Sequence, residues 1–280
     1  MIVRRWLPIL IVGLLLPVYF LALSTAAGER KKLLQVRAVS YVLPPQLLKI
    51  TTLEFDSLAA DFLFLKGLTF YGETMNRTER PRVTEDEWRW LYAVLDAATD
   101  LDPWFYDPYY FANTNFTWDA GKAREANTLL AKGNKARTWD WTIPFFMGFN
   151  EYYFLHDHAK AAEYLMEGSR RPDADPIVAG LAVRMAYKGS GTEIAIAFLQ
   201  ATLKTLGDSP EKYVMEARLK VFKEIQALEQ VIAVYTRYHG SPPASLQELV
   251  RKGIIKQIPV DPYGGKLYID SDGNIRSTIR

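Results

Sequence analysis

Apolar and small residues recur in the middle of the chain with one internal spacing and one period. Within each group, three residues lie four and three positions apart, which places them on one face of an α-helix. The groups follow one another at offsets of 35, 35 and 34 residues: Leu91, Leu95 and Ala98; Ala126, Leu130 and Gly133; Ala161, Leu165 and Gly168; Ala195, Leu199 and Thr202. Faces built from leucines and small side chains predict helices that pack closely against their neighbours.

The segments between these groups also carry apolar residues at helical spacing. They are Asp107 to Trp118, Trp141 to Phe154 and Pro176 to Tyr187. Turn signals separate the helices: Asp102-Pro103, Arg171-Pro172-Asp173, Gly189-Ser190-Gly191 and Gly207-Asp208. The sequence therefore predicts a repeating unit of two antiparallel helices in about 34–35 residues.

Two stretches of the repeats are similar to a known family. The segments WLYAVLDAATDLDPWF (90–105) and HDHAKAAEYLMEGSRRPDA (156–174) resemble the second helix and closing turn of the tetratricopeptide repeat. The resemblance covers roughly residues 88–206. It implies an α-solenoid whose concave face binds peptide segments of partner proteins. Stacking is obligatory in such a fold, because no single helix pair can bury its own apolar face.

One column of residues within the repeats is the candidate binding surface. In the family, one face of each first helix lines the groove, and the matching positions here recur at 34- and 35-residue offsets. They are Phe111, Asn115, Trp118, Phe146, Asn150, Tyr153, Arg184 and Tyr187. Asparagine and arginine can bond main-chain groups or carboxylates, and aromatic rings supply flat contact area. The alternative is that the aromatic side chains fill the core and the polar ones are solvated.

An uncharged apolar segment lies near the start of the chain. It runs over 18 residues from Trp6 to Leu23. At ~1.5 Å per residue it spans about 27 Å, close to the hydrocarbon thickness of a bilayer. We expect residues 1–27 to act as a transmembrane signal anchor. The small residues Thr25-Ala26-Ala27 leave cleavage as a signal peptide open, although such peptides have a shorter apolar region of roughly 7–15 residues.

Basic residues on both sides of this segment bear on its orientation. Arg4 and Arg5 precede it, and Arg30, Lys31 and Lys32 follow it. Because the first charged group normally dominates, we expect a cytoplasmic start. The bulk of the chain is then expected in the periplasm, held to a bacterial inner membrane by a single span.

Residues 28–87 form a predicted juxtamembrane helical segment. We expect residues 46–71 to form one strongly apolar helix, followed by a loop from Gly72 to Thr84. Asp61 lies among leucines and phenylalanines of this helix, so we expect a buried carboxylate with a structural partner. Charged residues interrupt the apolar run and argue against a second span; contact with the membrane surface is the alternative placement.

Residues 207–280 are predicted to hold a long amphipathic helix, from Pro210 to about Tyr238, and a small C-terminal module. This region resembles the C-terminal part of the major pseudopilins of type II secretion. The matching pieces after the long helix are Gly240-Ser241-Pro242-Pro243, Ser245-Leu246-Gln247-Glu248-Leu249, Asp261-Pro262-Tyr263-Gly264-Gly265 and a hairpin around Ser271-Asp272-Gly273. The amino-terminal helix lacks a pilin-like processing site followed by phenylalanine and glutamate. We therefore expect the module to cap the exposed end of the repeats.

Composition narrows the classes of function. The chain of 280 residues has 34 basic and 32 acidic side chains, and this balance offers no basic stripe for nucleic acid. It has no cysteine, which excludes disulfides, thiolate metal sites and a cysteine nucleophile. The sequence also lacks a glycine-rich phosphate loop with its lysine, an HExxH motif and a GxSxG motif. We infer no cofactor, no metal, no small-molecule substrate and no enzymatic activity.

The remaining candidate for a metal site is a pair of histidines. His156-Asp157-His158 has donors that could ligate a metal, but it falls in the predicted turn between two paired helices. A polar turn between helices is the simpler explanation of this pattern.

The sequence as a whole predicts a mostly α protein. We expect a TPR-like α-solenoid of helix hairpins, with an N-terminal transmembrane helix and a small C-terminal α+β module. The expected function is that of a membrane-anchored, periplasm-facing scaffold or adaptor. It would bind protein or peptide partners in the assembly or export of envelope or extracellular structures. The alternatives are a structural subunit of a type II secretion or pilus-like apparatus, and an enzyme that uses the turn of His156 and His158.

Overall fold

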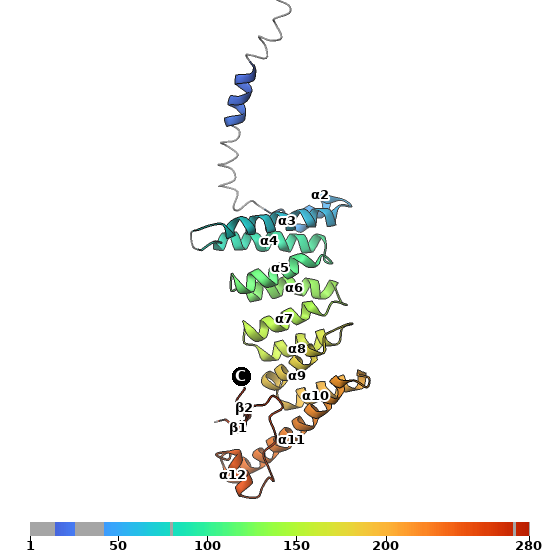
Figure 1. The fold of residues 1–280 in the computed structure, drawn as a ribbon, viewed down its shortest axis with the longest axis vertical. Coiled ribbons are helices and arrows are strands. Elements are labelled where there is room, and N and C mark those ends of the chain that lie inside the picture. Colours follow the sequence, from blue (N-terminus) through green and yellow to red (C-terminus); the bar gives the residue numbers. More distant parts are fainter. Residues whose placement is uncertain (1–14, 26–41, 79–80, 271–272, 280) are drawn as a thin grey trace, which may run out of the picture. The chain divides into compact units, whose positions relative to one another are not determined.

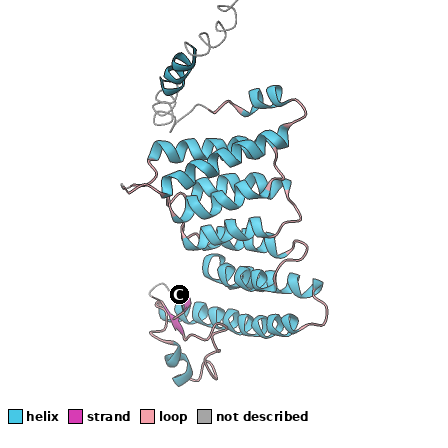
Figure 2. Ribbon diagram, turned by 45° about the horizontal axis from the view of Figure 1, so that its top comes forward, coloured by secondary structure: helices cyan, strands magenta, loops and turns pink. Residues whose placement is uncertain are grey.

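The computed structural model describes residues 15–25, 42–78, 81–270 and 273–279. These residues are mostly helical, with one two-stranded antiparallel sheet near the C-terminal end (Figure 1, Figure 2). The chain divides into two compact units, Met1–Asp102 and Pro103–Arg280. The division falls at the predicted turn Asp102-Pro103, so the first helix of the repeat pattern belongs to a different unit from the others.

After residue 42, the first unit contains the helices α2 (Pro45–Thr52), α3 (Asp56–Met75) and α4 (Glu85–Leu101). A capping box starts α4, because the Thr84 hydroxyl accepts from the Glu87 N–H and the Glu87 carboxylate accepts from the Thr84 N–H. α3 packs against α4 at Gly67, where an added Cβ would lie 3.2 Å from Leu91 Cδ1. The small residue therefore brings the two helices together.

Three expectations for this unit are wrong. Residues 46–71 do not form one helix, because the chain breaks at Leu53, whose φ of 53° lies outside the right-handed helical region. The second helix then continues to Met75, beyond the expected start of the loop at Gly72. Asp61 is exposed, since α3 buries the face that carries Ala60 and Asp61 points about 100° away from that residue.

The expected anchor lies mostly outside the described residues. Its described part, residues 15–25, is helical and carries exposed apolar side chains. Within the described ranges, no helix combines the length and the hydrophobicity needed to cross a membrane. The anchor from Trp6 to Leu23 therefore stays a prediction.

In the second unit, consecutive helices pack side by side in chain order. The elements are α5 (Tyr106–Trp118), α6 (Ala123–Ala136), α7 (Thr142–Tyr153), α8 (His158–Ser169), α9 (Pro176–Ser190), α10 (Thr192–Thr205), α11 (Pro210–His239), α12 (Leu246–Arg251), β1 (Leu267–Ile269) and β2 (Ile275–Ser277). The predicted helices between the triplets correspond to α5, α7 and α9. The expected mostly helical fold with a small C-terminal pair of strands is thus confirmed.

The periodic triplets are the buried faces of α4 in the first unit and of α6, α8 and α10 in the second. All members of the four triplets are buried except Thr202, which is half-exposed. A Cβ added at Gly133 would lie 2.9 Å from Ile143 Cδ1, and one at Gly168 would lie 3.3 Å from the Trp141 carbonyl oxygen. The small positions therefore set the distance between neighbouring helices, as the sequence predicted.

α8 and α9 approach each other closely at Gly189. A Cβ on this residue would lie 2.3 Å from the backbone nitrogen of Ala159 and 2.5 Å from the carbonyl carbon of His158. Both neighbouring atoms belong to the backbone, which cannot move aside as a side chain can. The end of α9 is therefore fixed against the start of α8.

Two arginines, 34 residues apart, join successive turns of the second unit. Arg171 donates to the carbonyl oxygens of Arg137 at 3.0 Å and Asp140 at 2.7 Å, and also to Asn134 Oδ1 at 2.6 Å and Glu167 Oε1 at 2.6 Å. Arg137 donates in the same way to the Trp104 carbonyl oxygen of the preceding turn. The Arg171 side chain is only 8% exposed, so its many acceptors offset the cost of burying its charge.

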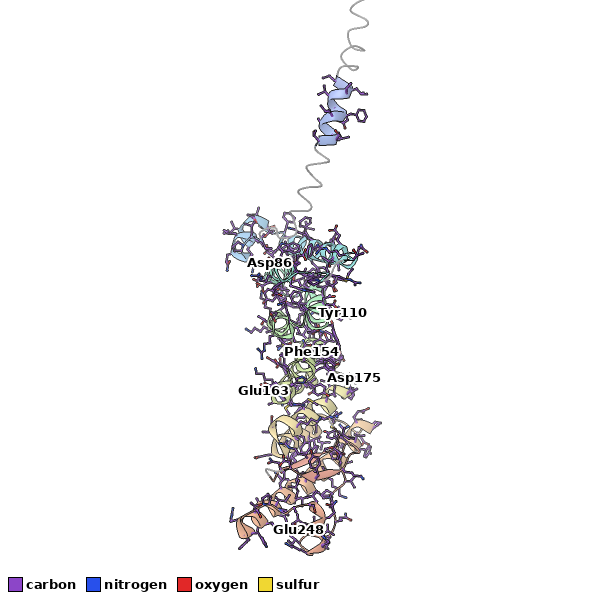
Figure 3. All side chains as sticks on the ribbon, turned by 90° about the vertical axis from the view of Figure 1, so that its left-hand side faces the viewer. Asp86, Tyr110, Phe154, Glu163, Asp175 and Glu248 are labelled. Carbon is purple, nitrogen blue, oxygen red and sulfur yellow. The ribbon has the colours of Figure 1, made fainter. Side chains whose placement is uncertain are left out.

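The C-terminal module belongs to the same hydrophobic core as the last repeats. Leu246, Leu249, Leu267 and Ile275 are buried in one cluster with residues of α8 to α11. The short helix α12 is fastened by Glu248, labelled in Figure 3, which accepts from Tyr235 Oη at 2.9 Å and Lys252 Nζ at 2.7 Å. The Lys252 ammonium and the hydrogen bonds from the Ala244 N–H and the Tyr235 hydroxyl lower the pKa of Glu248 to about 2.

Gly189 offers a direct test of this packing. We expect Gly189→Ala to lower the free energy of unfolding by about 1–3 kcal/mol, because its methyl group would overlap the backbone of α8. Gly207→Ala is the matched control, since no atom lies within 4 Å of its added Cβ. Urea denaturation followed by circular dichroism measures both variants. Equal stability of the two variants would contradict the close contact.

Candidate functional site

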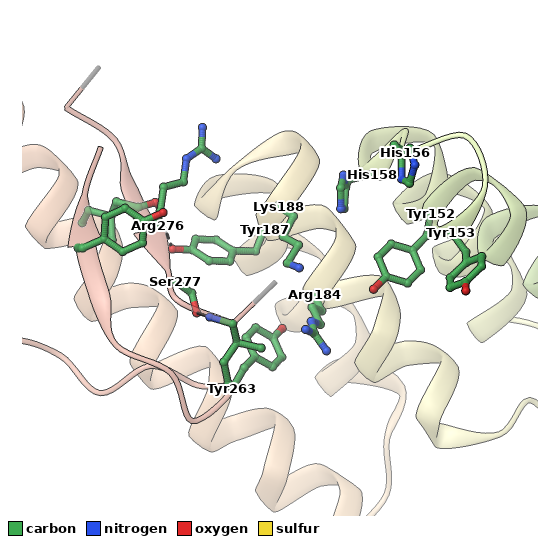
Figure 4. Close-up of a pocket in the computed structure, with 13 residues that line it drawn as sticks. Tyr152, Tyr153, His156, His158, Arg184, Tyr187, Lys188, Tyr263, Arg276 and Ser277 are labelled. Atoms are coloured by element: carbon green, nitrogen blue, oxygen red, sulfur yellow. Dashed lines mark hydrogen bonds between the residues drawn. The ribbon is translucent and has the colours of Figure 1, made fainter. Parts of the chain in front are cut away.

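The second unit contains a pocket of about 870 Å³ between the α7–α8 turn, α9 and the C-terminal hairpin (Figure 4). Its volume lies in the range typical of ligand-binding pockets. Two kinds of side chain dominate its wall. The basic and imidazole groups are His156, His158, Arg184, Lys188 and Arg276, and the aromatic groups are Tyr152, Tyr153, Tyr187, Tyr263 and Tyr268.

α9 supplies the cations at the centre of the pocket. Arg184 and Lys188 are four residues apart and point from one face of this helix into the space beside the hairpin (Figure 4). Among the described residues that line the pocket there is no aspartate or glutamate. Burial and the nearby Arg184 guanidinium lower the pKa of the Lys188 ammonium. The wall thus holds like charges close together.

The α7–α8 turn places the imidazole rings of His156 and His158 in the wall of the same pocket. Asp157 caps α8 by accepting from the Lys160 N–H at 3.0 Å, and His156 adopts a left-handed φ of 56° just before the cap. The His158 ring lies 5.7 Å from the Tyr152 ring. Burial, the Lys188 ammonium and His156 lower the pKa of His158. The contact at Gly189 explains this proximity, because Gly189 follows Lys188 and touches the backbone of His158.

The C-terminal hairpin closes the opposite side of the pocket. The Tyr187 hydroxyl donates to the Ile275 carbonyl oxygen at 3.5 Å, which connects α9 with β2 (Figure 4). Burial and the charges of Glu229 and Asp261 raise the pKa of Tyr187 to about 12, so this side chain stays a neutral phenol. Arg276 Nε donates to Asp270 Oδ2 at 3.0 Å, which holds the Arg276 guanidinium at the rim.

The Tyr263 ring lines the pocket between the guanidinium groups of Arg184 and Arg218. Its ring centroid lies 5.5 Å from Arg184 Cζ and 5.7 Å from Arg218 Cζ, distances typical of cation–π contact. Buried Asp261 fixes the turn, because its carboxylate accepts from the Tyr263 N–H at 2.9 Å and from the Ser277 hydroxyl. Burial raises the pKa of the Tyr263 phenol. The turn that precedes β1 therefore contributes a fixed aromatic surface.

The structure brings three of the eight predicted site residues into this pocket. They are Tyr153, Arg184 and Tyr187. Trp118 lies next to the pocket, since its exposed ring is 5.5 Å from the Tyr153 ring and 4.9 Å from the Phe154 ring. Ring contacts also connect Phe154, the C-cap of α7, with Tyr110 of α5 by way of Phe149, Phe145 and Phe146; Tyr110 and Phe154 are labelled in Figure 3.

The remaining predicted residues lie elsewhere. Phe111 is buried, and Asn115 donates to its carbonyl oxygen at 2.8 Å within α5. Phe146 is half-buried, with its ring 6.0 Å from the Tyr110 ring. Asn150 is buried and donates to Asn113 Oδ1 at 2.8 Å and Asn127 Oδ1 at 2.9 Å. We leave Phe111 and Asn150 out of the candidate site, because interior side chains have no surface to offer a partner.

Several pocket residues were missed by sequence reasoning. Lys188 lies one helical turn after Arg184, and this spacing alone could have paired the two. Tyr263 and Arg276 come from a module that the sequence assigned to capping, and no local pattern connects that module with α9. His156 and His158 do lie in the predicted turn between helices. In the part of the chain that the structure describes, no three His, Asp or Glu side chains are grouped to hold a metal ion.

Comparison of this chain with family models, with curated proteins and with solved structures gives no match.

The lowered pKa of His158 predicts a pH dependence of stability. The unfolded chain takes up this proton near the ordinary value of about 6.5, whereas the folded chain takes it up only at lower pH. Between these values the unfolded state binds more protons, so stability falls as the pH drops through about 6.5 and below. We expect His158→Gln to reduce the difference between unfolding free energies measured at about pH 7.5 and about pH 5.5. Lys188→Met should reduce it partially, because the ammonium contributes to the shift. An unchanged difference in both variants would contradict this assignment.

Proposed function

We propose that this chain is a protein-binding scaffold and that the pocket beside α9 receives an anionic peptide segment. The single observation that carries the proposal is the wall of the pocket, in which cations and tyrosines converge and no carboxylate is found among the described lining residues. Guanidinium and ammonium groups favour carboxylates through charge-assisted hydrogen bonds. An acidic side chain or a C-terminal carboxylate is therefore the chemistry that the pocket fits best.

The tyrosine walls indicate what accompanies the carboxylate. Aromatic rings offer large, rigid contact area at low cost in conformational entropy, and they prefer aromatic or apolar partners. The exposed ring of Trp118 extends this surface from Tyr153 onto α5. A segment that combines an acidic group with an aromatic or apolar side chain can use both parts of the wall.

The wider setting of the proposal comes from the sequence. We propose that the helix hairpins form a TPR-like scaffold, held at a bacterial inner membrane by the apolar segment from Trp6 to Leu23 and facing the periplasm. Its partners would be proteins in the assembly or export of envelope or extracellular structures. The resemblance of the C-terminal module to pseudopilins supports one alternative, a structural subunit of a type II secretion or pilus-like apparatus.

Peptide selection on the full chain tests the pocket. A random hexapeptide library with free C-terminal carboxylates should be enriched in Asp or Glu together with aromatic residues. Lys188→Gln and Arg184→Gln should each weaken binding of a selected peptide by about tenfold, the effect of one charge-assisted hydrogen bond. Lys223→Gln on the exposed side of α11 is the matched control, and it should leave the affinity unchanged. Fluorescence anisotropy at low and high salt provides the measurement, and salt should weaken binding.

Three results would oppose the proposal. One is enrichment of basic peptides, because the pocket repels cations. Another is an equal loss of affinity in Lys223→Gln, which would mean that net charge alone governs binding. The third is stoichiometric incorporation of the chain into one secretion machine without peptide binding, which would favour the structural subunit.

A further inference from the structure

The first unit carries an exposed apolar surface that its own helices do not cover. We define the α2–α3 face as Leu47, Ile50, Phe55, Leu58, Phe62 and Leu65, whose side chains are 49–69% exposed. On α3, the residues at 58, 62 and 65 follow the spacing of one helix face. Single exposed apolar residues are ordinary, but a contiguous run of large ones marks a surface that binds something.

The opposite side of α3 is already used. Ala60, Gly67, Tyr71 and Thr74 are buried on it, and Gly67 makes the close contact with Leu91 of α4. A helix of the outer layer normally presents a polar face to water on the side away from its partner. α3 instead has leucine and phenylalanine there, so its composition fits an apolar contact on both sides.

We infer that the α2–α3 face lies against the surface of a lipid bilayer, with its leucine, isoleucine and phenylalanine side chains among the upper acyl chains. On α3, Leu58, Phe62 and Leu65 form a continuous exposed apolar row, the kind of helix face that contacts acyl chains at a bilayer surface. Its exposed charged neighbours Lys49, Glu54 and Asp61 can stay in the headgroup layer, whereas the Lys66 ammonium lies 5.4 Å from the Trp90 ring centroid. They carry both signs, so the apolar contact, and not lipid charge, provides the binding.

The position of the α2–α3 face in the chain favours a membrane, and not another protein, as the surface that covers it. The 18 uncharged residues that end at Leu23 precede it, and the segment from Ser24 to Pro44 between them has 21 residues. Even fully extended, at most ~3.6 Å per residue, this segment reaches about 75 Å. This step rests on the proposed membrane tether, which keeps the face at a high effective concentration next to the bilayer. α2 and α3 are then a second, lateral contact that orients the first unit on the membrane.

The absence of cysteine makes a direct test possible. Three variants of the full chain each carry one cysteine, in place of Phe62 on the face, Leu16 in the apolar segment or Lys223 on α11. An environment-sensitive fluorophore is attached to that cysteine. The proteins are reconstituted into phosphatidylcholine vesicles, with and without phosphatidylglycerol. Iodide then quenches labels in water, and nitroxides attached to the acyl chains quench labels in the bilayer.

We expect the Phe62→Cys label to be quenched by the nitroxides and to be at least threefold less accessible to iodide than the Lys223→Cys label. The result should be the same in both lipid compositions. The inference would be overturned if iodide quenched the label at position 62 as strongly as the label at position 223. It would also be overturned if neither iodide nor the nitroxides quenched the label at position 62, because protein would then cover the face. The Leu16→Cys label reports separately on the tether. Nitroxide quenching at Leu16 without quenching at Phe62 refutes only the inference, and the reverse result refutes only the tether.

Discussion

The backbone contact between α8 and α9 at Gly189 is the constraint on which the second unit depends. Helices that pack across leucine faces are held about 8–10 Å apart by their side chains, and a position without a side chain lets two backbones meet. At Gly189 the neighbouring atoms belong to His158 and Ala159. This one contact closes the helix pair, and it also places the imidazole of His158 beside the ammonium of Lys188. Stability and the geometry of the pocket therefore have the same origin.

Arginine and lysine side chains of the second unit have two different kinds of surroundings. At the turns between repeats, Arg171 is surrounded by carbonyl oxygens, an amide and a carboxylate, so its charge is fully compensated. In the pocket, the cations of α9 lie beside other cations and aromatic rings. The first arrangement fixes successive turns to each other. Under the proposed function, the second is the place where a bound anion would reduce the repulsion between the Arg184 and Lys188 side chains.

The repeat was predictable because it is local. A spacing of four and three within a period of 34–35 residues reports on helix faces directly, and the buried triplets follow it. The break at Leu53 was not predictable, since neither proline nor glycine stands between α2 and α3 to signal it. Asn150 shows a second limit, because the same amide can serve a groove or an interior network. The pocket itself joins Tyr187 to Ile275 across 88 residues, a distance that no periodicity reaches.

The contribution of the C-terminal hairpin to the pocket has a consequence for biosynthesis. α9 leaves the ribosome well before Tyr263 and Ile275, and at ~5–20 residues per second the delay is on the order of ten seconds. During this interval the helix hairpins can assemble, while one wall of the pocket does not yet exist. A nascent chain therefore carries Arg184 and Lys188 before the hairpin residues that form the opposite wall of the pocket. Under the proposed function, the chain would become able to bind a partner only late in translation, after the helix hairpins have had time to fold.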